Sequence, residues 1–286
     1  MRLVYIVSAY KLPDQVVRLV LKLNDDEASH FFIHVDRKTD DATFRRMWTG
    51  LSPLSNVYFL PRHRCHYGGF GHVRATIKSI NEICRQRLSF DYAILLTGQD
   101  YPIKSNHQIN EFFEQHQGQS FIEYSSLPHP EWDYGGMDRI EGWHARFGRN
   151  YFRFPGQSRV KVRRRFPSLQ PFGGSAYWCL SRECIEYIYE FLQENRSYVR
   201  FFKYVNVPEE IFFHTIVLNS RLKERVMNDD LRFLEWRNPA LAGGPAVLGK
   251  EDFGKITHSP KLFARKFDIT QDAEILDMID ARTRGD

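Results

Sequence analysis

The N-terminal part of the chain alternates between short apolar runs and stretches with apolar residues at helical spacing. Leu3–Ala9 is a continuous apolar run, the pattern of a parallel strand that is buried on both faces. A helix is predicted at Pro13–Leu23, followed by a strand at 30–35, a helix near 42–47 and a strand at 57–60. This β-α-β-α-β order is typical of the nucleotide-binding half of an α/β sheet.

The same patterns continue toward the C-terminus with one interruption. Further strands are predicted at 92–96, 120–124, 172–180 and 231–236, and helices at 73–87, 106–116, 182–192, 209–219 and 273–282. Ser105 and Ser181 precede two of these helices as N-cap residues. Between residues 127 and 171 the periodicity fails, which predicts a long functional loop. We therefore expect one α/β domain with a mostly parallel central sheet flanked by helices, its nucleotide-binding half at 1–125 and its acceptor half at 126–286.

Glu209 and Glu210 form a carboxylate pair at the predicted start of helix 209–219. Pro208 fits the first helical position, and the apolar residues that follow would bury one face of the helix. A carboxylate fixed there is rigid, partly desolvated and directed outward, as a general base must be. The alternative is a negative N-terminus that only complements the helix dipole.

Charge is unevenly distributed along the chain. The net charge is +5, and much of it comes from the segment between Arg146 and Arg165, where arginines alternate with aromatic residues. Such a segment can meet phosphate backbones, anionic lipid surfaces or acidic glycans, and it can also be a solvated loop face. No apolar stretch reaches the length of a membrane span, and the opening run lacks a cleavage signal. We expect a cytoplasmic protein that can touch the inner face of the membrane.

The sequence argues against several common cofactor sites. It contains no GxGxxG fingerprint and no P-loop. The four cysteines lack zinc-ligand spacing and are expected as buried free thiols. The cluster from His63 to His72 matches no metal-site template, and its glycines predict a loop instead. Gly68 and Gly69 would let the backbone of this loop approach a ligand or turn sharply.

Two aspartates mark the expected ligand edge of the sheet. Asp36 and Asp100 come just after the carboxyl ends of predicted strands, where open α/β sheets bind their ligands. A single Asp at such a place is equally common as a turn or cap residue.

Seven motifs in order resemble one known family. They are HVDRK (34–38), YGG-x-G-x-V (67–73), LLTGQDYPIKS (95–105), GGSAYW (173–178), PEE-x-FFHT (208–215), LRFLEW (231–236) and LFARKFD (262–268). Their order and wording are similar to glycosyltransferase family 14, the core 2/I-branching N-acetylglucosaminyltransferases and peptide O-xylosyltransferases. The resemblance covers nearly the whole chain, and we expect a compact, bacterial member of this family.

The resemblance implies a GT-A-type fold, a UDP-sugar donor, inversion at the anomeric carbon and catalysis without a metal. Consistent with the last point, no D-x-D motif follows a strand in the donor half, and Asn228-Asp229-Asp230 is predicted to be a turn. Glu210 takes the place of the family's catalytic base, and Glu209 replaces the Asp of its PDE motif. The other expected site residues are Arg232, Lys266 and Arg265 for the donor diphosphate, Asp36, Tyr67, Gly68 and Gly69 for the uridine side, and Asp100, Glu123, Ser175, Tyr177 and Trp178 for the acceptor or the cleft.

These roles agree with the chemistry of a single displacement. The acceptor hydroxyl must lose its proton as it attacks, so one carboxylate must reach it. The departing UDP develops negative charge, and a fixed cation about 4 Å away contributes on the order of 4 kcal/mol at an effective dielectric constant near 20. Retaining hydrolysis would need two carboxylates about 5 Å apart around the sugar. Neighbouring residues of a helix, such as Glu209 and Glu210, point in different directions.

We therefore predict an inverting, metal-independent glycosyltransferase. It would move N-acetylglucosamine or xylose from UDP to a hydroxyl of a carbohydrate, lipid-linked or peptide acceptor in surface polysaccharide or glycan synthesis, with no nucleic-acid partner. Two alternatives stay open. One is a non-catalytic protein that binds a polyanion or glycan, and the other is a metal-dependent transferase or hydrolase that uses the cluster from His63 to His72.

Overall fold

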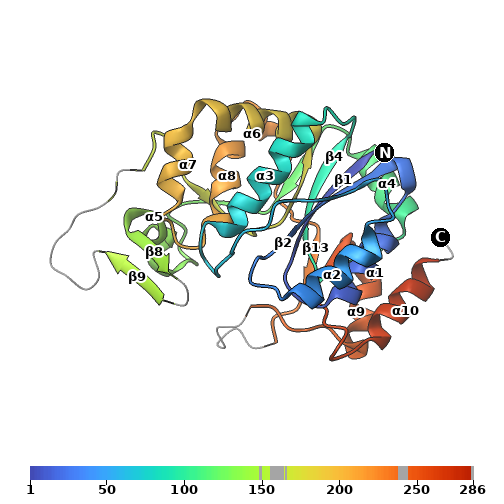
Figure 1. The fold of residues 1–286 in the computed structure, drawn as a ribbon. Coiled ribbons are helices and arrows are strands. Elements are labelled where there is room, and N and C mark those ends of the chain that lie inside the picture. The colour runs from blue at the N-terminus through green and yellow to red at the C-terminus, as the bar shows by residue number, and fades with distance from the viewer. Residues whose placement is uncertain (148–149, 155–163, 165, 238–243, 285–286) are drawn as a thin grey trace. The chain divides into compact units, whose positions relative to one another are not determined.

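The computed structural model describes residues 1–147, 150–154, 164, 166–237 and 244–284 (Figure 1). The chain divides into two units, each discontinuous in sequence. Unit 1 consists of Met1–Arg62, Ser89–Gln117 and Leu231–Asp286, and unit 2 of His63–Leu88 and Gly118–Asp230. These units do not coincide with the predicted halves 1–125 and 126–286, because the chain passes between the units several times.

Unit 1 contains a parallel sheet with the strand order β4-β1-β2-β3. Its first strand is buried almost throughout, as its apolar sequence predicts. A smaller sheet has the order β13-β14-β5. The elements of unit 1 are β1 (Leu3–Ala9), α1 (Pro13–Leu23), β2 (Ser29–Val35), α2 (Asp41–Leu51), β3 (Val57–Phe59), β4 (Tyr92–Thr97), β5 (Asp100–Pro102), α4 (Asn106–Gln115), β13 (Arg232–Leu234), α9 (Phe253–His258), β14 (Phe263–Arg265), α10 (Glu274–Thr283) and two short 3-10 helices, Asp26–Ala28 and Lys250–Asp252.

Local sequence explains how these helices begin and pack. Pro13 starts α1, and Ser105 caps α4 in a reciprocal capping box with Gln108. The helices α1 and α2 lie side by side (Figure 1). Gly50 permits this approach, since a Cβ there would lie 2.7 Å from Cγ2 of Val17. The predicted starts of α1 at Pro13 and of α4 after Ser105 are confirmed.

Unit 2 is built from short strands and longer helices. Strand β6 pairs with β11 antiparallel and with β12 parallel, while β7 pairs with β10 and β8 with β9. Ser181 caps α6, as predicted. The elements are α3 (Gly71–Arg85), β6 (Ser120–Ile122), β7 (Ser125–Ser126), α5 (Asp138–Glu141), β8 (Trp143–Phe147), β9 (Asn150–Phe154), β10 (Phe172–Gly173), β11 (Trp178–Ser181), α6 (Arg182–Glu194), α7 (Arg196–Phe202), α8 (Phe212–Leu218), β12 (Val226–Met227) and three short 3-10 helices, Asp133–Gly136, Pro208–Glu210 and Lys223–Arg225.

Unit 2 departs from the predicted elements in two places. The expected strand 172–180 is two strands, β10 and β11. They are separated where Gly174 passes so close to the backbone of Glu123 that a Cβ would collide with its carbonyl oxygen. The expected loop 127–171 contains α5 and the β8–β9 hairpin. Since β9 is exposed along its whole length, its sequence does not show the alternation of a half-buried strand.

The fold class is confirmed as mixed α/β with a mostly parallel sheet and flanking helices. All four cysteines are free thiols. Across the described part of the chain, no helix is both long and apolar enough to cross a bilayer.

Candidate active site

The carboxylates of Glu209 and Glu210 lie on a single 3-10 turn, Pro208–Glu210, in unit 2. This corrects the prediction that they open an α-helix, because the backbone of Ile211 leaves helical geometry and α8 begins only at Phe212. Val207 enters the turn in a left-handed conformation with φ of 48°. The dipole of α8 therefore does not begin at the carboxylates, and their environment is set by the side chains around them.

Glu210 is fixed by an arginine that the sequence did not single out. Nη1 of Arg139 lies 2.5 Å from Oε2 of Glu210, and the guanidinium stacks over the ring of Trp132 at 4.5 Å. No described residue donates a hydrogen bond to Oε1 of Glu210, and the Glu210 side chain is 33% exposed. The carboxylate is thus oriented through one oxygen and accessible through the other.

Glu209 has a different environment although it is the neighbouring residue. Part of the residue reaches the surface, but its Oε2 is buried and has no hydrogen-bond partner among the described residues. The pKa of Glu209 is raised to about 8, chiefly by burial and to a lesser extent by the charge of Glu210, while a backbone hydrogen bond and the charges of Arg139 and Arg146 act in the opposite direction. Two adjacent carboxyl groups with such different environments are a pattern found at catalytic sites.

The predicted uridine loop at Tyr67, Gly68 and Gly69 lies beside this turn within unit 2. The carbonyl of Gly68 accepts a hydrogen bond from the amide of Val207 at 2.9 Å. A Cβ on Gly68 would lie 2.7 Å from Nη2 of Arg146, which itself donates to the side chain of Asn206 at 2.9 Å. Only a glycine fits here, because φ of Gly68 is +62° as well.

Arginines in the basic segment between Arg146 and Arg165 have structural partners where they are described. Arg146 contacts the loop at Gly68. Arg164 is buried and donates to the carbonyls of Phe201, Gly142 and Tyr204, so at this position the alternative of a solvated loop face is wrong. Burial lowers the pKa of Arg164 to about 10. Residues 148–149, 155–163 and 165 of the segment lie outside the described residues.

Several predicted acceptor residues gather near Glu210. The amide of Gly174, next to Ser175, donates to the carbonyl of Glu210 at 2.9 Å, and the exposed Glu123 follows β6 with its backbone against Gly174. Ser175 Oγ donates to Asp230 at 2.6 Å. Tyr177 is partly exposed in the segment between β10 and β11.

The prediction that Trp178 lies at the acceptor or the cleft is wrong. Its side chain is 0% exposed and packs against Phe213 with ring centroids 5.8 Å apart. A fully buried indole belongs to the core and does not line a cleft, since no surface is left for a substrate to touch.

In unit 1, the predicted diphosphate cations lie at the edge of the small sheet. Arg265 ends β14, and its Nη1 lies 3.7 Å from Oδ1 of Asp100. The pKa of Lys266 is lowered by burial and by the positive charges of Arg265 and Lys11. Cations held this close to one another favour an anion at the same place.

Arg232 and Asp100 are more deeply buried than expected. Arg232 is 3% exposed, donates to the carbonyl of Leu95 at 2.7 Å and stacks over Phe263. Asp100 is 0% exposed and accepts hydrogen bonds from the amide and hydroxyl of Thr97. Asp100 therefore lies buried beside the guanidinium of Arg265 and does not line a cleft. This corrects its predicted place at the acceptor or the cleft.

Asp36 follows β2 and closes a tight turn. Its Oδ1 accepts from the amide of Lys38 at 2.8 Å, and its own amide donates to the carbonyl of Ala9 at 2.9 Å, so it lies at the carboxyl end of β1. Lys11, two residues beyond Ala9, forms an ion pair with Asp268 at 2.9 Å. Asp36 thus lies at the carboxyl end of the parallel sheet of unit 1, and Lys11 follows the carboxyl end of β1, which is the edge where α/β sheets bind ligands.

Two segments that the sequence raised as candidate metal sites lie in unit 2. Nε2 of His63 is hydrogen-bonded to the carbonyl of Gly71 at 2.9 Å, which closes the glycine loop. Asp229 donates its amide to the carbonyl of Met227 at 2.9 Å, as expected for a turn at Asn228-Asp229-Asp230.

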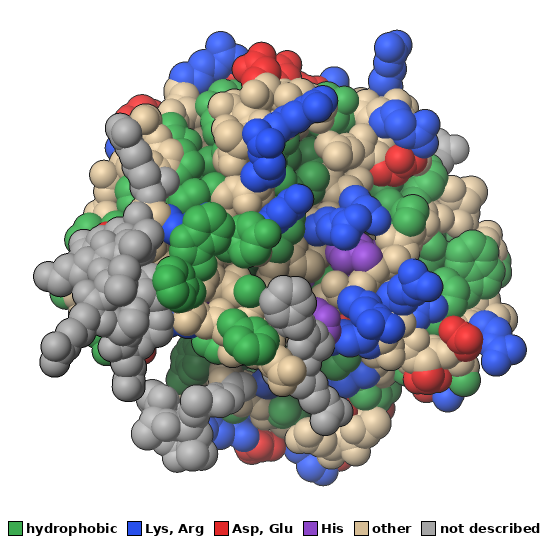
Figure 2. Space-filling view, turned by 60° about the vertical axis from the view of Figure 1, so that its left-hand side comes forward, with side chains coloured by type: hydrophobic (Ala, Val, Ile, Leu, Met, Phe, Trp, Pro, Cys, Tyr) green, Lys and Arg blue, Asp and Glu red, His purple; other side chains and the backbone are tan. Residues whose placement is uncertain are grey.

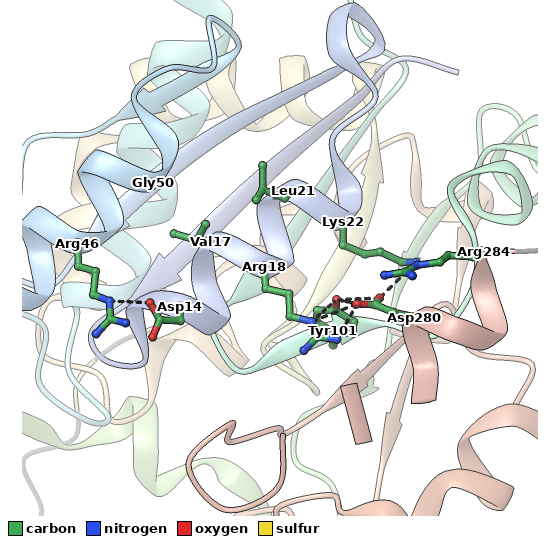
Figure 3. Close-up of a pocket in the computed structure, with 10 residues that line it drawn as sticks. All are labelled: Asp14, Val17, Arg18, Leu21, Lys22, Arg46, Gly50, Tyr101, Asp280 and Arg284. Carbon is green, nitrogen blue, oxygen red and sulfur yellow. Dashed lines mark hydrogen bonds and ion pairs between the residues drawn. The ribbon is translucent and has the colours of Figure 1, made fainter. Parts of the chain in front are cut away.

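A cavity of about 540 Å³ in unit 1 is separate from the predicted site residues (Figure 3). It lies between α1, α2 and α10, and its charged groups point toward one another. Asp280 accepts from Arg18 at 2.7 Å and from Tyr101 at 3.0 Å, and Lys22 lies 3.3 Å from it. These bonds tie α10 to α1, so the groups around Asp280 serve to hold the C-terminal helix.

Comparison with known proteins identifies the family to which this chain belongs. The family model for the core-2/I-branching enzymes matches residues 3–257, and the chain belongs to that family. The predicted resemblance is confirmed. Among the relatives, xylosyltransferase 2 from Rattus norvegicus is 23% identical over 99% of this chain and 34% of its own length, and the Homo sapiens protein of that name is 24% identical over the same shares. Xylosyltransferase 1 from Homo sapiens is 22% identical over 98% of this chain and 30% of its own length. The chain thus spans about a third of the length of these relatives.

Proposed function

We propose that the protein is an inverting glycosyltransferase that transfers a sugar from a UDP-sugar to an acceptor hydroxyl without a metal. Membership of the core-2/I-branching enzyme family supports the reaction class. The relatives named xylosyltransferases favour xylose as donor sugar, and the motif resemblance to core 2/I-branching N-acetylglucosaminyltransferases favours N-acetylglucosamine. Both donors belong to the proposal, with a carbohydrate, lipid-linked or peptide acceptor in glycan synthesis.

The observation that carries the proposal is the arrangement around Glu210. Arg139 holds Oε2, so Oε1 can accept the proton of an acceptor hydroxyl as its oxygen attacks the anomeric carbon. In the same step the bond from that carbon to the UDP oxygen breaks. Arg139 acts as a positioning residue, because it orients the base without touching the reacting atoms.

The departing UDP develops negative charge. Cationic side chains that could neutralise this charge lie in unit 1. Arg265 and Lys266 lie in consecutive positions after β14, with Lys11 close enough to lower the pKa of Lys266. We assign the donor diphosphate to Lys266 and Arg265, and Asp36 to the uridine side with the loop Tyr67–Gly69. We predicted Arg232 at the diphosphate as well. Because its guanidinium is buried and donates to the carbonyl of Leu95, we assign it a supporting role there.

A donor screen with EDTA present tests the proposal. UDP release would be measured with UDP-xylose, UDP-N-acetylglucosamine, UDP-glucose and UDP-galactose, for the wild type and for Lys266→Ala. We expect turnover of one donor in EDTA and a raised KM for that donor in Lys266→Ala. Lys255→Ala is the control, since Lys255 forms an exposed ion pair with Glu235.

Two outcomes would support the alternatives. Activity that EDTA abolishes and a divalent cation restores would indicate a metal-dependent enzyme. Absence of both nucleotide binding and turnover with every donor would indicate a binding protein.

A further inference from the structure

Val207, the residue before the carboxylate turn Pro208–Glu210, has an unusual backbone conformation. Its φ of 48° and ψ of 55° lie in the left-handed region. Six described residues other than glycine have a positive φ, and Val207 is the β-branched one among them. Two heavy atoms on Cβ crowd the backbone in this region, and a proline favours an extended conformation in the residue before it. Both the side chain of Val207 and its neighbour Pro208 therefore oppose the conformation that the chain adopts here.

Hydrogen bonds within unit 2 hold Val207 in this conformation. The amide of Asn206 donates to the carbonyl of Arg139 at 3.1 Å, and the amide of Val207 donates to the carbonyl of Gly68 at 2.9 Å. On the other side of the residue, the amide of Glu210 donates to the carbonyl of Val207 at 3.2 Å. A strained residue persists only where its surroundings fix it in this way, and such residues are concentrated at functional sites.

The same contacts connect Val207 to the carboxylate of Glu210. Arg139 accepts the amide of Asn206 through its backbone carbonyl and pairs with Oε2 of Glu210 through its guanidinium. The segment 206–210 must therefore turn so that both of its ends meet one residue. Because the ring of Pro208 fixes φ of that residue, the φ and ψ of Val207 set the direction in which the turn continues.

Electrostatic attraction alone would not fix the direction of the Glu210 carboxylate. The positive charges of Arg139 and Arg146 both lower the pKa of the neighbouring Glu209, so more than one cation acts on this turn. Figure 2 shows that Lys and Arg side chains also gather on one face of the molecule. An ion pair at a partly exposed position contributes little energy and is easily exchanged for another partner. A backbone that admits one direction of the turn removes this freedom before a substrate binds.

We propose that Val207 is a positioning residue for the base Glu210. Its left-handed conformation directs the turn so that Oε2 of Glu210 meets Arg139 and Oε1 is accessible to the acceptor hydroxyl. A glycine would adopt the same φ and ψ without strain, but it would also admit many other conformations, and the carboxylate would be less well fixed. The strain at Val207 lowers stability, and the narrow choice of conformations keeps the base in place. This inference rests on the proposed role of Glu210.

Thermal unfolding and transfer kinetics of Val207→Gly test the inference, with Val226→Gly as the matched control. Val226 is also a half-buried valine of unit 2, but its φ of −95° is free of strain. We expect Val207→Gly to keep or raise Tm, because strain is removed, while kcat falls about tenfold or more at an unchanged KM for the UDP-sugar. Val226→Gly should lower Tm and leave kcat unchanged. Val207→Thr keeps the branched shape and should keep the wild-type kcat.

Two results would overturn the inference. One is a Tm of Val207→Gly that falls as far as that of Val226→Gly, which would show that Val207 is not strained; this measurement needs no sugar transfer. The other is a wild-type kcat in Val207→Gly. Glu210→Gln, assayed beside it, separates the two levels of the argument. A slow Glu210→Gln enzyme with a fully active Val207→Gly enzyme rejects this inference alone, whereas a fully active Glu210→Gln enzyme rejects Glu210 as the base and this inference with it.

Discussion

At the scale of single residues, environment matters more than residue type. Glu209 and Glu210 are adjacent and chemically identical, yet Oε2 of Glu209 is buried without a hydrogen bond among the described residues, while Glu210 is ion-paired and partly exposed. The sequence predicted the carboxylate pair, and its catalytic role stays a prediction. It did not predict Arg139, Arg146 or Asn206, because they lie in segments without periodicity and their proximity to the pair depends on the fold of unit 2.

Glu209 should make the protein less stable as the pH rises. Its pKa is about 8 when folded and near 4.5 when unfolded, so between these values the folded state binds more protons than the unfolded state. The free energy of unfolding should fall across this window, by at most about 5 kcal/mol in total. Denaturant unfolding at several pH values would show this fall in the wild type and a smaller one in Glu209→Gln. A variant whose stability follows the wild type at every pH would contradict the assignment.

His214 should have the opposite effect in acid. It is fully buried, its Nε2 donates to the carbonyl of Ser175 at 2.9 Å, and burial lowers its pKa to about 4. As the pH falls from about 6.5 to 4, the unfolded state takes up the proton first, so stability should be lost by about 3 kcal/mol. Wild type and His214→Gln would be compared by denaturant unfolding over this range. If both lost stability in parallel, His214 would not be the titrating group.

At the scale of elements, the patterns of burial and capping predicted most of unit 1. The continuous apolar runs form β1, β2 and β4, and Ser105 caps α4 as expected; in unit 2, Ser181 caps α6 as expected. Two predictions of elements failed, because neither segment shows the burial pattern of a regular strand or helix. The exposed hairpin β8–β9 is one case, and the turn before α8, where Ile211 interrupts the helix, is the other.

Asp280 should stabilise the attachment of α10 to α1. It is 9% exposed and accepts or pairs with Arg18, Lys22 and Tyr101. Asp280→Asn would leave buried positive charge uncompensated and should lower the free energy of unfolding by about 3 kcal/mol. Asp14→Asn, which breaks the exposed pair with Arg46, is the matched control and should cost less than about 1 kcal/mol. Equal effects of the two variants would show that the network around Asp280 does not hold the helix.

At the scale of the whole molecule, the order of seven short motifs indicated the family, and the match over residues 3–257 confirms it. Motif order carries this information because each motif occupies a separate position in the fold. Donor sugar, acceptor and metal independence stay predictions, because they depend on a few pocket contacts that the motifs do not specify.

The most direct test of the central claim is the transfer rate of Glu210→Gln beside Glu186→Gln. Glu186 is a partly exposed carboxylate paired with Arg182 on α6, and its loss should leave the rate unchanged. Gln at 210 can keep a hydrogen bond to Arg139 but cannot accept the acceptor's proton, so kcat should fall about 10²–10⁴-fold with UDP affinity retained. A Glu210→Gln enzyme that transfers sugar at the wild-type rate would contradict the assignment of Glu210 as the base.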